Sequence, residues 1–249
     1  LLPSSWPAEQ QAELLTNTSL AQLENWRSEA FTTLAVIGGL HGNVDTQDAE
    51  NLADLLTTLL PLNRVTRTRP SVEQINESAS IDLAVDHNDA ALLIYAQDPD
   101  DSFASRAKSA LAGQLLRSPF FSSLRTDQQL GYVVSAGIRR MDTQSGNLFL
   151  VQSPSAGVAH IENAVMVFLE QYIAQWDDIP KDAFEQQKAG LITRLMEKDK
   201  NLTQRSQRYW RSLSEENFAF DSNRQIADQV SSLKKQDMKM FLEDLYQRV

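Results

Sequence analysis

Two kinds of hydrophobic pattern follow one another along this chain, and their order restricts its fold class. Residues 31–153 contain stretches of β-rich or period-two character, with single helical patterns inserted between them. From residue 160 onward the apolar residues recur only at helical spacing. A doubly wound parallel sheet needs strands and helices that alternate throughout. The order therefore predicts an α+β fold, a two-layer sandwich in which helices cover a largely antiparallel sheet.

The expected strands lie between short turns and polar loops. His87-Asn88-Asp89 predicts a hairpin turn, and the polar loop 139–146 predicts that the strands on either side of it pair in antiparallel fashion. The predicted strands are residues 31–37, 81–86, 90–96, 129–138 and 147–152.

The helical patterns begin and end at recognisable residues. The acidic run 98–102 offers N-caps for the helix that follows, while Pro61 and Pro119 are expected to end helices. No strand pattern follows the last helix, so we expect a sheet without its final strand and a chain that is part of a longer polypeptide. The predicted helices are residues 14–30, 45–60, 103–116, 160–176, 180–198, 202–216, 222–231 and 235–246.

The charge balance argues against nucleic acid and membranes as partners. The chain has 33 acidic and 23 basic side chains, and a net charge of −10 repels phosphate backbones and anionic surfaces. Two basic clusters occur, at 64–69 and 205–211, and the second interleaves aromatic residues as single-strand binders do. Such clusters are usually solvated faces or local ion pairs. Because no apolar run reaches 18 residues, membrane insertion is not expected either.

The chain offers few residues for a self-contained catalytic centre. It has no cysteine, and its three histidines, His41, His87 and His160, stand outside the His-Glu-x-x-His and His-x-x-Glu-His zinc patterns. Gly38-Gly39-x-x-Gly42 lacks the spacing of a dinucleotide site and is interpreted as a tight turn. No metal or cofactor site is therefore expected in this chain.

One stretch, Leu124–Val134, combines an arginine and a tyrosine in a polar loop at the mouth of a predicted strand. A guanidinium and a phenol together suit the binding of a peptide carbonyl or carboxylate. Gly131, beside Tyr132, permits close approach of another backbone. Two structural interpretations stay open: Tyr132 shares strand parity with core-like neighbours, and Arg125 could cover the end of the preceding helix.

The same region carries a family resemblance. Residues 118–134, 137–140 and 146–153, which include Leu-Arg-Thr-Asp-Gln-Gln-Leu-Gly-Tyr, resemble the C-terminal part of the pitrilysin and insulin-degrading enzyme family of zinc metallopeptidases, and its bacterial members most. Weaker likeness extends through residues 40–43, 209–210 and 217–221. The resemblance implies that residues 1–30 connect to a preceding domain and that residues 31–249 form one domain, the last of four and incomplete at its C-terminus.

The resemblance also implies a function and its site residues. In this family two halves close around a peptide or small protein, and the zinc lies in the N-terminal half, whose glutamate activates a zinc-bound water. Arg125 then binds a substrate carbonyl and Tyr132 donates to the oxyanion of the transition state. The full-length protein is accordingly expected to be a periplasmic endopeptidase, whereas this chain alone, without the N-terminal half as partner, is expected to be inactive. The alternative is a catalytically inactive structural relative, such as a core subunit or a peptide-binding module.

Overall fold

The computed structural model describes residues 6–60 and 72–249. By their contacts, the described residues divide into two compact units, one within Leu1–Glu73 and Asp199–Phe220 and the other within Gln74–Lys198 and Asp221–Val249. The predicted division at residue 30 stays a prediction, and the basic cluster 64–69 lies outside the described residues. None of the described helices combines the length and the hydropathy that a membrane-spanning segment needs.

The first unit contains the helices α1 (Ala8–Thr16), α2 (Leu20–Ala30), α3 (Thr46–Leu59) and α7 (Leu202–Ser214). The helix predicted over 14–30 is in fact two helices, because Ser19 forms a capping box with Gln22 and starts a new one. The strand predicted over 31–37 is wrong, since only Leu34 makes an isolated bridge there. A β-rich sequence forms a strand only where a neighbouring strand supplies the ladder.

The second unit is built on an antiparallel sheet of β1 (Ala90–Gln97), β2 (Val133–Met141) and β3 (Gln144–Ser153), in the order β1-β3-β2. The α+β class and the antiparallel pairing of β2 with β3 are thereby confirmed. The strand β2 begins four residues later than predicted, because Gln129 has a φ of 52° and turns the backbone away from extended geometry.

The predicted strand 81–86 and its hairpin with β1 are wrong as well. Residues 81–86 are not in a strand, and the apolar side chains of Ile81, Leu83 and Val85 are exposed. The preceding segment is held by side chains instead of a ladder: the Ile75 N–H donates to Gln97 Oε1 at 2.6 Å. Alternating hydrophobicity therefore indicated a strand here without specifying a partner.

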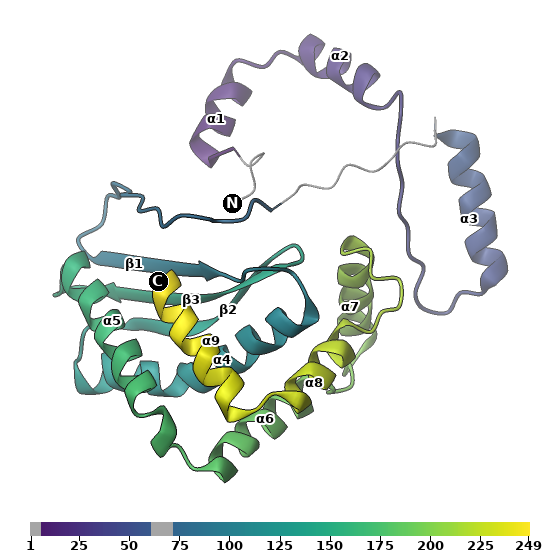
Figure 1. The fold of residues 1–249 in the computed structure, drawn as a ribbon. Coiled ribbons are helices and arrows are strands. Elements are labelled where there is room, and N and C mark those ends of the chain that lie inside the picture. The colour runs from purple at the N-terminus through teal and green to yellow at the C-terminus, as the bar shows by residue number, and fades with distance from the viewer. Residues whose placement is uncertain (1–5, 61–71) are drawn as a thin grey trace. The chain divides into compact units, whose positions relative to one another are not determined.

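Helices cover one face of the sheet (Figure 1). The helix α4 (Phe103–Phe121) packs on β2 and β3, while α5 (Val158–Ala174) and α9 (Lys235–Arg248) pack on β1. The remaining helical segments of this unit are η1 (Ser122–Asp127), η2 (Trp176–Asp178), α6 (Lys181–Leu195) and α8 (Ser222–Ser232).

Pro119 does not end α4, contrary to the prediction. The helix continues to Phe121, and the N–H of Ser122 reaches the carbonyls of Ser118 and Pro119. The chain then passes into the wider turn η1, a π-helix. Pro119 has no N–H to donate to the Leu115 carbonyl, and that carbonyl accepts a hydrogen bond from the Tyr172 hydroxyl at 3.4 Å instead. The turn η1 carries α4 directly into the Arg125 loop.

Alternation along β3 separates a core face from an open face. Phe149 and Val151 are buried under the helices, whereas Leu148, Leu150 and Gln152 point to the opposite side and stay partly exposed. On the core face the Phe149 ring lies 5.5 Å from the Phe120 ring, centroid to centroid. The second unit is therefore a two-layer structure, as predicted, and Gln152 lies on its open face.

A buried carboxyl at the end of β1 makes the stability of this unit depend on pH. Asp98 is fully buried, accepts a hydrogen bond from Ser109 Oγ, and lies 3.9 Å from Arg248 Nη1 of α9. Burial raises the pKa of Asp98 to about 6 from an ordinary value of 3.8, against the opposing effects of Ser109 and Arg248.

We expect Asp98→Asn to remove one component of the pH dependence. Because the pKa of Asp98 is higher in the folded state than in the unfolded state, the folded state keeps this proton to a higher pH. The protonated carboxyl therefore favours folding at low pH, and this stabilisation is lost as pH rises from about 4 to about 6. Relative to Asp98→Asn, the wild-type chain should therefore lose up to about 3 kcal/mol of unfolding free energy between pH 4 and pH 7. Urea unfolding at both pH values measures this, with the exposed Asp101→Asn as control. An equal difference at both pH values would contradict it.

Candidate functional site

The loop that carries Arg125 and Tyr132 is fixed at both ends by buried leucines. Leu124, in η1, and Leu130, just before β2, are both buried, and the Leu130 N–H donates to the Leu124 carbonyl at 2.9 Å. The polar residues 126–129 between them are exposed. The apolar anchors hold a short polar loop on the surface with its ends together.

Gly131 lies against the backbone of β3. A Cβ atom on this residue would stand 2.0 Å from the carbonyl oxygen of Gln152 and 2.9 Å from its carbonyl carbon. The close backbone approach predicted for Gly131 is therefore confirmed. Its consequence is that the next residue, Tyr132, lies beside the side chain of Gln152.

The guanidinium of Arg125 binds the start of β2 to η1. Its Nη1 donates to the carbonyl of Tyr132 and, at 3.4 Å, to that of Gly131. The guanidinium carbon lies 5.5 Å from the centroid of the Phe121 ring, at the end of α4. Arg125 thus does contact the end of the preceding helix, and it also orders the backbone on which Tyr132 is mounted.

Tyr132 is a surface residue. Its exposed fraction is 51%, whereas Leu130 and Val134 are buried. The core interpretation of this tyrosine is wrong: Tyr132 lies outside the ladder of β2, which begins at Val133, and its side chain is exposed. Arg125, half-buried, and Tyr132, exposed, are joined through the Tyr132 carbonyl, so the structure brings the two predicted site residues together.

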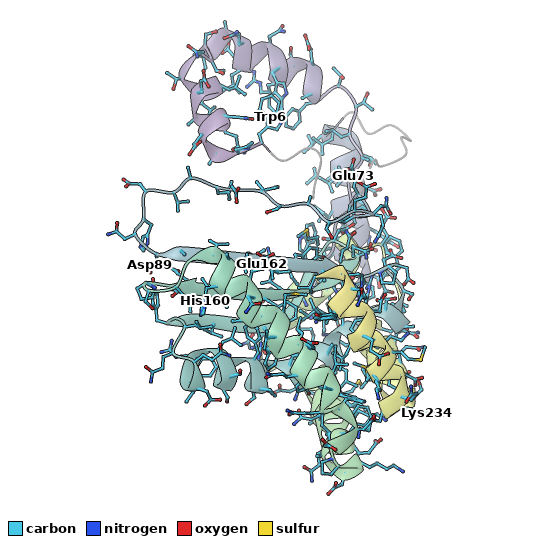
Figure 2. The ribbon with its side chains drawn as sticks, turned by 60° about the vertical axis from the view of Figure 1, so that its left-hand side comes forward. Trp6, Glu73, Asp89, His160, Glu162 and Lys234 are labelled. Carbon is cyan, nitrogen blue, oxygen red and sulfur yellow. The ribbon has the colours of Figure 1, made fainter. Side chains whose placement is uncertain are left out.

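The hydroxyl of Tyr132 has two side-chain partners. It donates to Asp89 Oδ2 at 2.6 Å and accepts from Gln152 Nε2 at 2.6 Å. Gln152 Nε2 also lies 3.2 Å from the same Asp89 oxygen. Figure 2 shows Asp89 at the end of the sheet where β1 begins. Three polar side chains from the ends of three strands therefore meet in one place.

Electrostatics keep the phenol of Tyr132 protonated. The hydrogen bond to Asp89, followed by desolvation and the charge of Asp89, raises the pKa of Tyr132 above its ordinary value of 10.0. His87 lies behind Asp89, with its Nδ1 accepting the Asp89 N–H at 3.0 Å and standing 3.8 Å from Asp89 Oδ1. A protonated, exposed phenol is a hydrogen-bond donor and not a base.

The sequence did not predict that Asp89 and Gln152 would bind the hydroxyl of Tyr132. Asp89 was interpreted only as part of a turn, and Gln152 as a strand residue within a stretch that carries the family resemblance, without a role of its own. The register of the sheet explains why these side chains meet. Gln152 of β3 pairs with Val133, the residue after Tyr132, and Ser153 of β3 pairs with Ala90, the residue after Asp89.

The other candidate residues lie elsewhere. In the first unit, His41 Nδ1 is 2.8 Å from Ser206 Oγ, and its ring packs edge-on against Tyr209. A Cβ on Gly39 would meet the Leu213 side chain at 2.8 Å, which supports a packing role for the glycine turn. His160 lies in the first turn of α5. Across residues 6–60 and 72–249, no three His, Cys, Asp or Glu side chains are grouped so that they could hold a metal ion.

Comparisons with known proteins find a matching family model and similar chains. A family model described as PQQ synthase PqqF-like, C-terminal lobe domain 4, matches residues 111–210, which include Arg125, Tyr132 and Gln152. The chain is 24% identical over 244 residues to a nardilysin-like protein of Arabidopsis thaliana. The alignment covers 94% of this chain and 24% of that protein. The chain is also 25% identical over 259 residues to insulin-degrading enzyme of Homo sapiens, in an alignment that covers 97% of this chain and 24% of that protein.

The fold agrees with a solved structure. The crystal structure of pitrilysin superposes on this chain with a TM-score of 0.78 at 22% sequence identity. The superposition covers 97% of this chain and 26% of the pitrilysin chain. This chain thus spans about a quarter of the length of the curated relatives it matches.

Proposed function

Because the chain belongs to the pitrilysin and insulin-degrading enzyme family, we propose that it is the non-zinc C-terminal domain of a zinc metalloendopeptidase. The observation that carries the proposal is the hydroxyl of the exposed residue Tyr132, which is protonated and oriented by two partners at the end of the sheet. The substrates are peptides or small proteins, held between this domain and the N-terminal half of the same polypeptide. We also propose that the full-length protein is periplasmic, which the resemblance to bacterial members supports.

The chemistry proposed for this chain is binding and charge stabilisation. Tyr132 donates its phenolic hydrogen to the scissile carbonyl oxygen as negative charge develops there. The Arg125 guanidinium carries five N–H donors. Its bonds to the carbonyls of Gly131 and Tyr132 both come from Nη1, so the donors on its other nitrogens can bind a substrate backbone carbonyl. Its own bonds to the loop keep both donors in a fixed relation, which limits the reorganisation needed on binding.

The zinc ion of the proposed enzyme does not fit the residues described here, among which no three His, Cys, Asp or Glu side chains are grouped so that they could hold it. The family resemblance supports assigning the zinc to the N-terminal half, and no step on this chain depends on it. The chain alone should hydrolyse no peptide when zinc is added. Appreciable peptidase activity that a chelator abolishes would overturn this assignment.

We expect Arg125→Ala in the full-length protein to lower kcat/KM for peptide hydrolysis about 10- to 100-fold. The variant removes charged donors to the substrate, each worth about 1.5–3 kcal/mol, and also loosens the Tyr132 loop. Steady-state kinetics with zinc content measured in parallel tests this. Arg139→Ala, an exposed arginine of β2, is the matched control and should retain wild-type kinetics.

The alternative, a catalytically inactive relative of the same fold, makes the opposite prediction. The full-length protein would then hydrolyse no peptide, and Arg125→Ala would affect stability alone. Unchanged turnover in Arg125→Ala with zinc retained would also show that the proposed role of this residue is wrong.

A further inference from the structure

The proposed function uses only one of the three polar side chains that meet at the end of the sheet. Asp89 precedes β1, Tyr132 precedes β2, and Gln152 lies near the end of β3, which runs between the other two strands. The contact of Gly131 with the Gln152 carbonyl fixes the backbones of β3 and of the Tyr132 loop against each other. The geometry of these side chains is therefore set by the sheet itself.

The bonding capacity of the Tyr132 hydroxyl is divided between its two partners. Its single proton is given to Asp89 Oδ2, and its oxygen accepts from Gln152 Nε2, both at 2.6 Å. A donor to the phenol oxygen orients the O–H group and strengthens it as a donor, since hydrogen bonds in a chain polarise one another. Gln152 therefore supports donation by Tyr132.

Asp89 has a different relation to the same proton. One phenolic hydrogen cannot be donated fully to a carboxylate and to a substrate oxyanion at once, and two anions beside the hydroxyl would repel each other. Gln152 carries no charge and therefore repels neither the Asp89 carboxylate nor the substrate oxyanion. The bond from Gln152 can therefore persist in the transition state, whereas the bond to Asp89 must be replaced.

We propose that Gln152 is a positioning residue for Tyr132, and that Asp89 holds the Tyr132 hydroxyl until a substrate carbonyl oxygen takes its place. This inference rests on the proposed function of Tyr132. Two further groups lie nearby: the titratable His87, whose Nδ1 is 3.8 Å from Asp89 Oδ1, and the charged Arg125, which binds the Tyr132 carbonyl. No covalent bond is made or broken in the exchange, in which one hydrogen-bond acceptor replaces another.

Titration of Tyr132 in this chain tests the arrangement without any activity assay. The protein is labelled with 3-fluorotyrosine, and the fluorine resonance of residue 132 is assigned by its absence in Tyr132→Phe. Gln152→Met removes the donor to the phenolate and should raise the pKa of Tyr132. Asp89→Asn removes the carboxylate that stabilises the phenol and should lower it.

The opposite signs distinguish positioning from a general loss of structure. If Gln152→Met merely disordered the loop, Tyr132 would also lose Asp89, and its pKa would fall toward the ordinary value. A fall or no change in Gln152→Met, or no fall in Asp89→Asn, would overturn the proposal. The exposed helical residues Gln171 and Asp228 provide matched controls, because Gln171→Met and Asp228→Asn should leave the resonance unchanged.

Kinetics of the full-length protein test whether the arrangement serves catalysis. Gln152→Met should lower kcat about 10-fold with little change in KM, the equivalent of one hydrogen bond in the transition state. In the Tyr132→Phe background the same substitution should have almost no further effect, because Gln152 acts through the hydroxyl. An equal loss in both backgrounds would overturn the positioning role. If Tyr132→Phe itself retained full activity, the proposed function would fail, while the titration would still decide the hydrogen-bond arrangement.

Discussion

Tyr132→Phe in the full-length protein is expected to lower kcat for peptide hydrolysis about 100-fold and to leave the bound zinc unchanged. The substitution deletes one hydroxyl from an exposed ring, so the ring and its packing are kept. Removing a single donor to a developing oxyanion typically costs about 100- to 1000-fold in kcat. Because the phenol is held protonated beside Asp89, the wild-type residue supplies this donor throughout the neutral range.

Steady-state kinetics on an internally quenched peptide, with metal analysis of each preparation, measure the effect. Tyr246→Phe on α9 is the matched control, since it removes a hydroxyl far along the sequence from the loop and should keep wild-type kcat. Turnover by Tyr132→Phe within about 2-fold of wild type, with zinc retained, would show that Tyr132 has no part in the reaction.

Gly131→Ala should destabilise the chain by about 1–3 kcal/mol and also lower the activity of the full-length protein. The new Cβ atom would stand 2.0 Å from the Gln152 carbonyl oxygen, and the atoms it meets all belong to the β3 backbone. No flexible side chain can move to relieve this contact, so the loop must shift away from β3. Such a shift separates the Tyr132 hydroxyl from Gln152, whose bond depends on the present approach.

Gly137 provides a control of the same chemical type in β2. A Cβ atom there would have nothing within 4 Å, so Gly137→Ala should be neutral or slightly stabilising. Urea unfolding of the two variants and of the wild-type chain gives the comparison. If Gly131→Ala matched Gly137→Ala in stability, the close contact between the loop and β3 would not exist in solution.

The helices and the pairing of β2 with β3 could be predicted because their signals are local. A 3.6-residue repeat or a polar loop between two β-rich runs is contained in one stretch of sequence, as in α5 or residues 139–146. The strands predicted at 31–37 and 81–86 failed for the opposite reason. A strand is defined by hydrogen bonds to a partner, and alternating apolar residues do not specify one.

The candidate site divides in the same way. Arg125 and Tyr132 occur in one short motif, so the sequence could point to both. Gly131, in the same motif, predicted the close approach of another backbone. Asp89 and Gln152 come from segments 43 and 20 residues away from Tyr132, and only the register of β3 brings them to its hydroxyl. The exposure of Tyr132 likewise could not be found by an argument from strand parity, since Leu130 and Val134, which share its parity, are buried.

The most direct test is a crystal structure of the full-length protein with a phosphinic peptide, whose phosphinate imitates the tetrahedral intermediate. The Tyr132 hydroxyl should lie within about 3 Å of a phosphinate oxygen, keep its bond from Gln152, and no longer donate to Asp89. A hydroxyl that still donates to Asp89, with the phosphinate bound elsewhere, would contradict the role of this chain in stabilising the transition state.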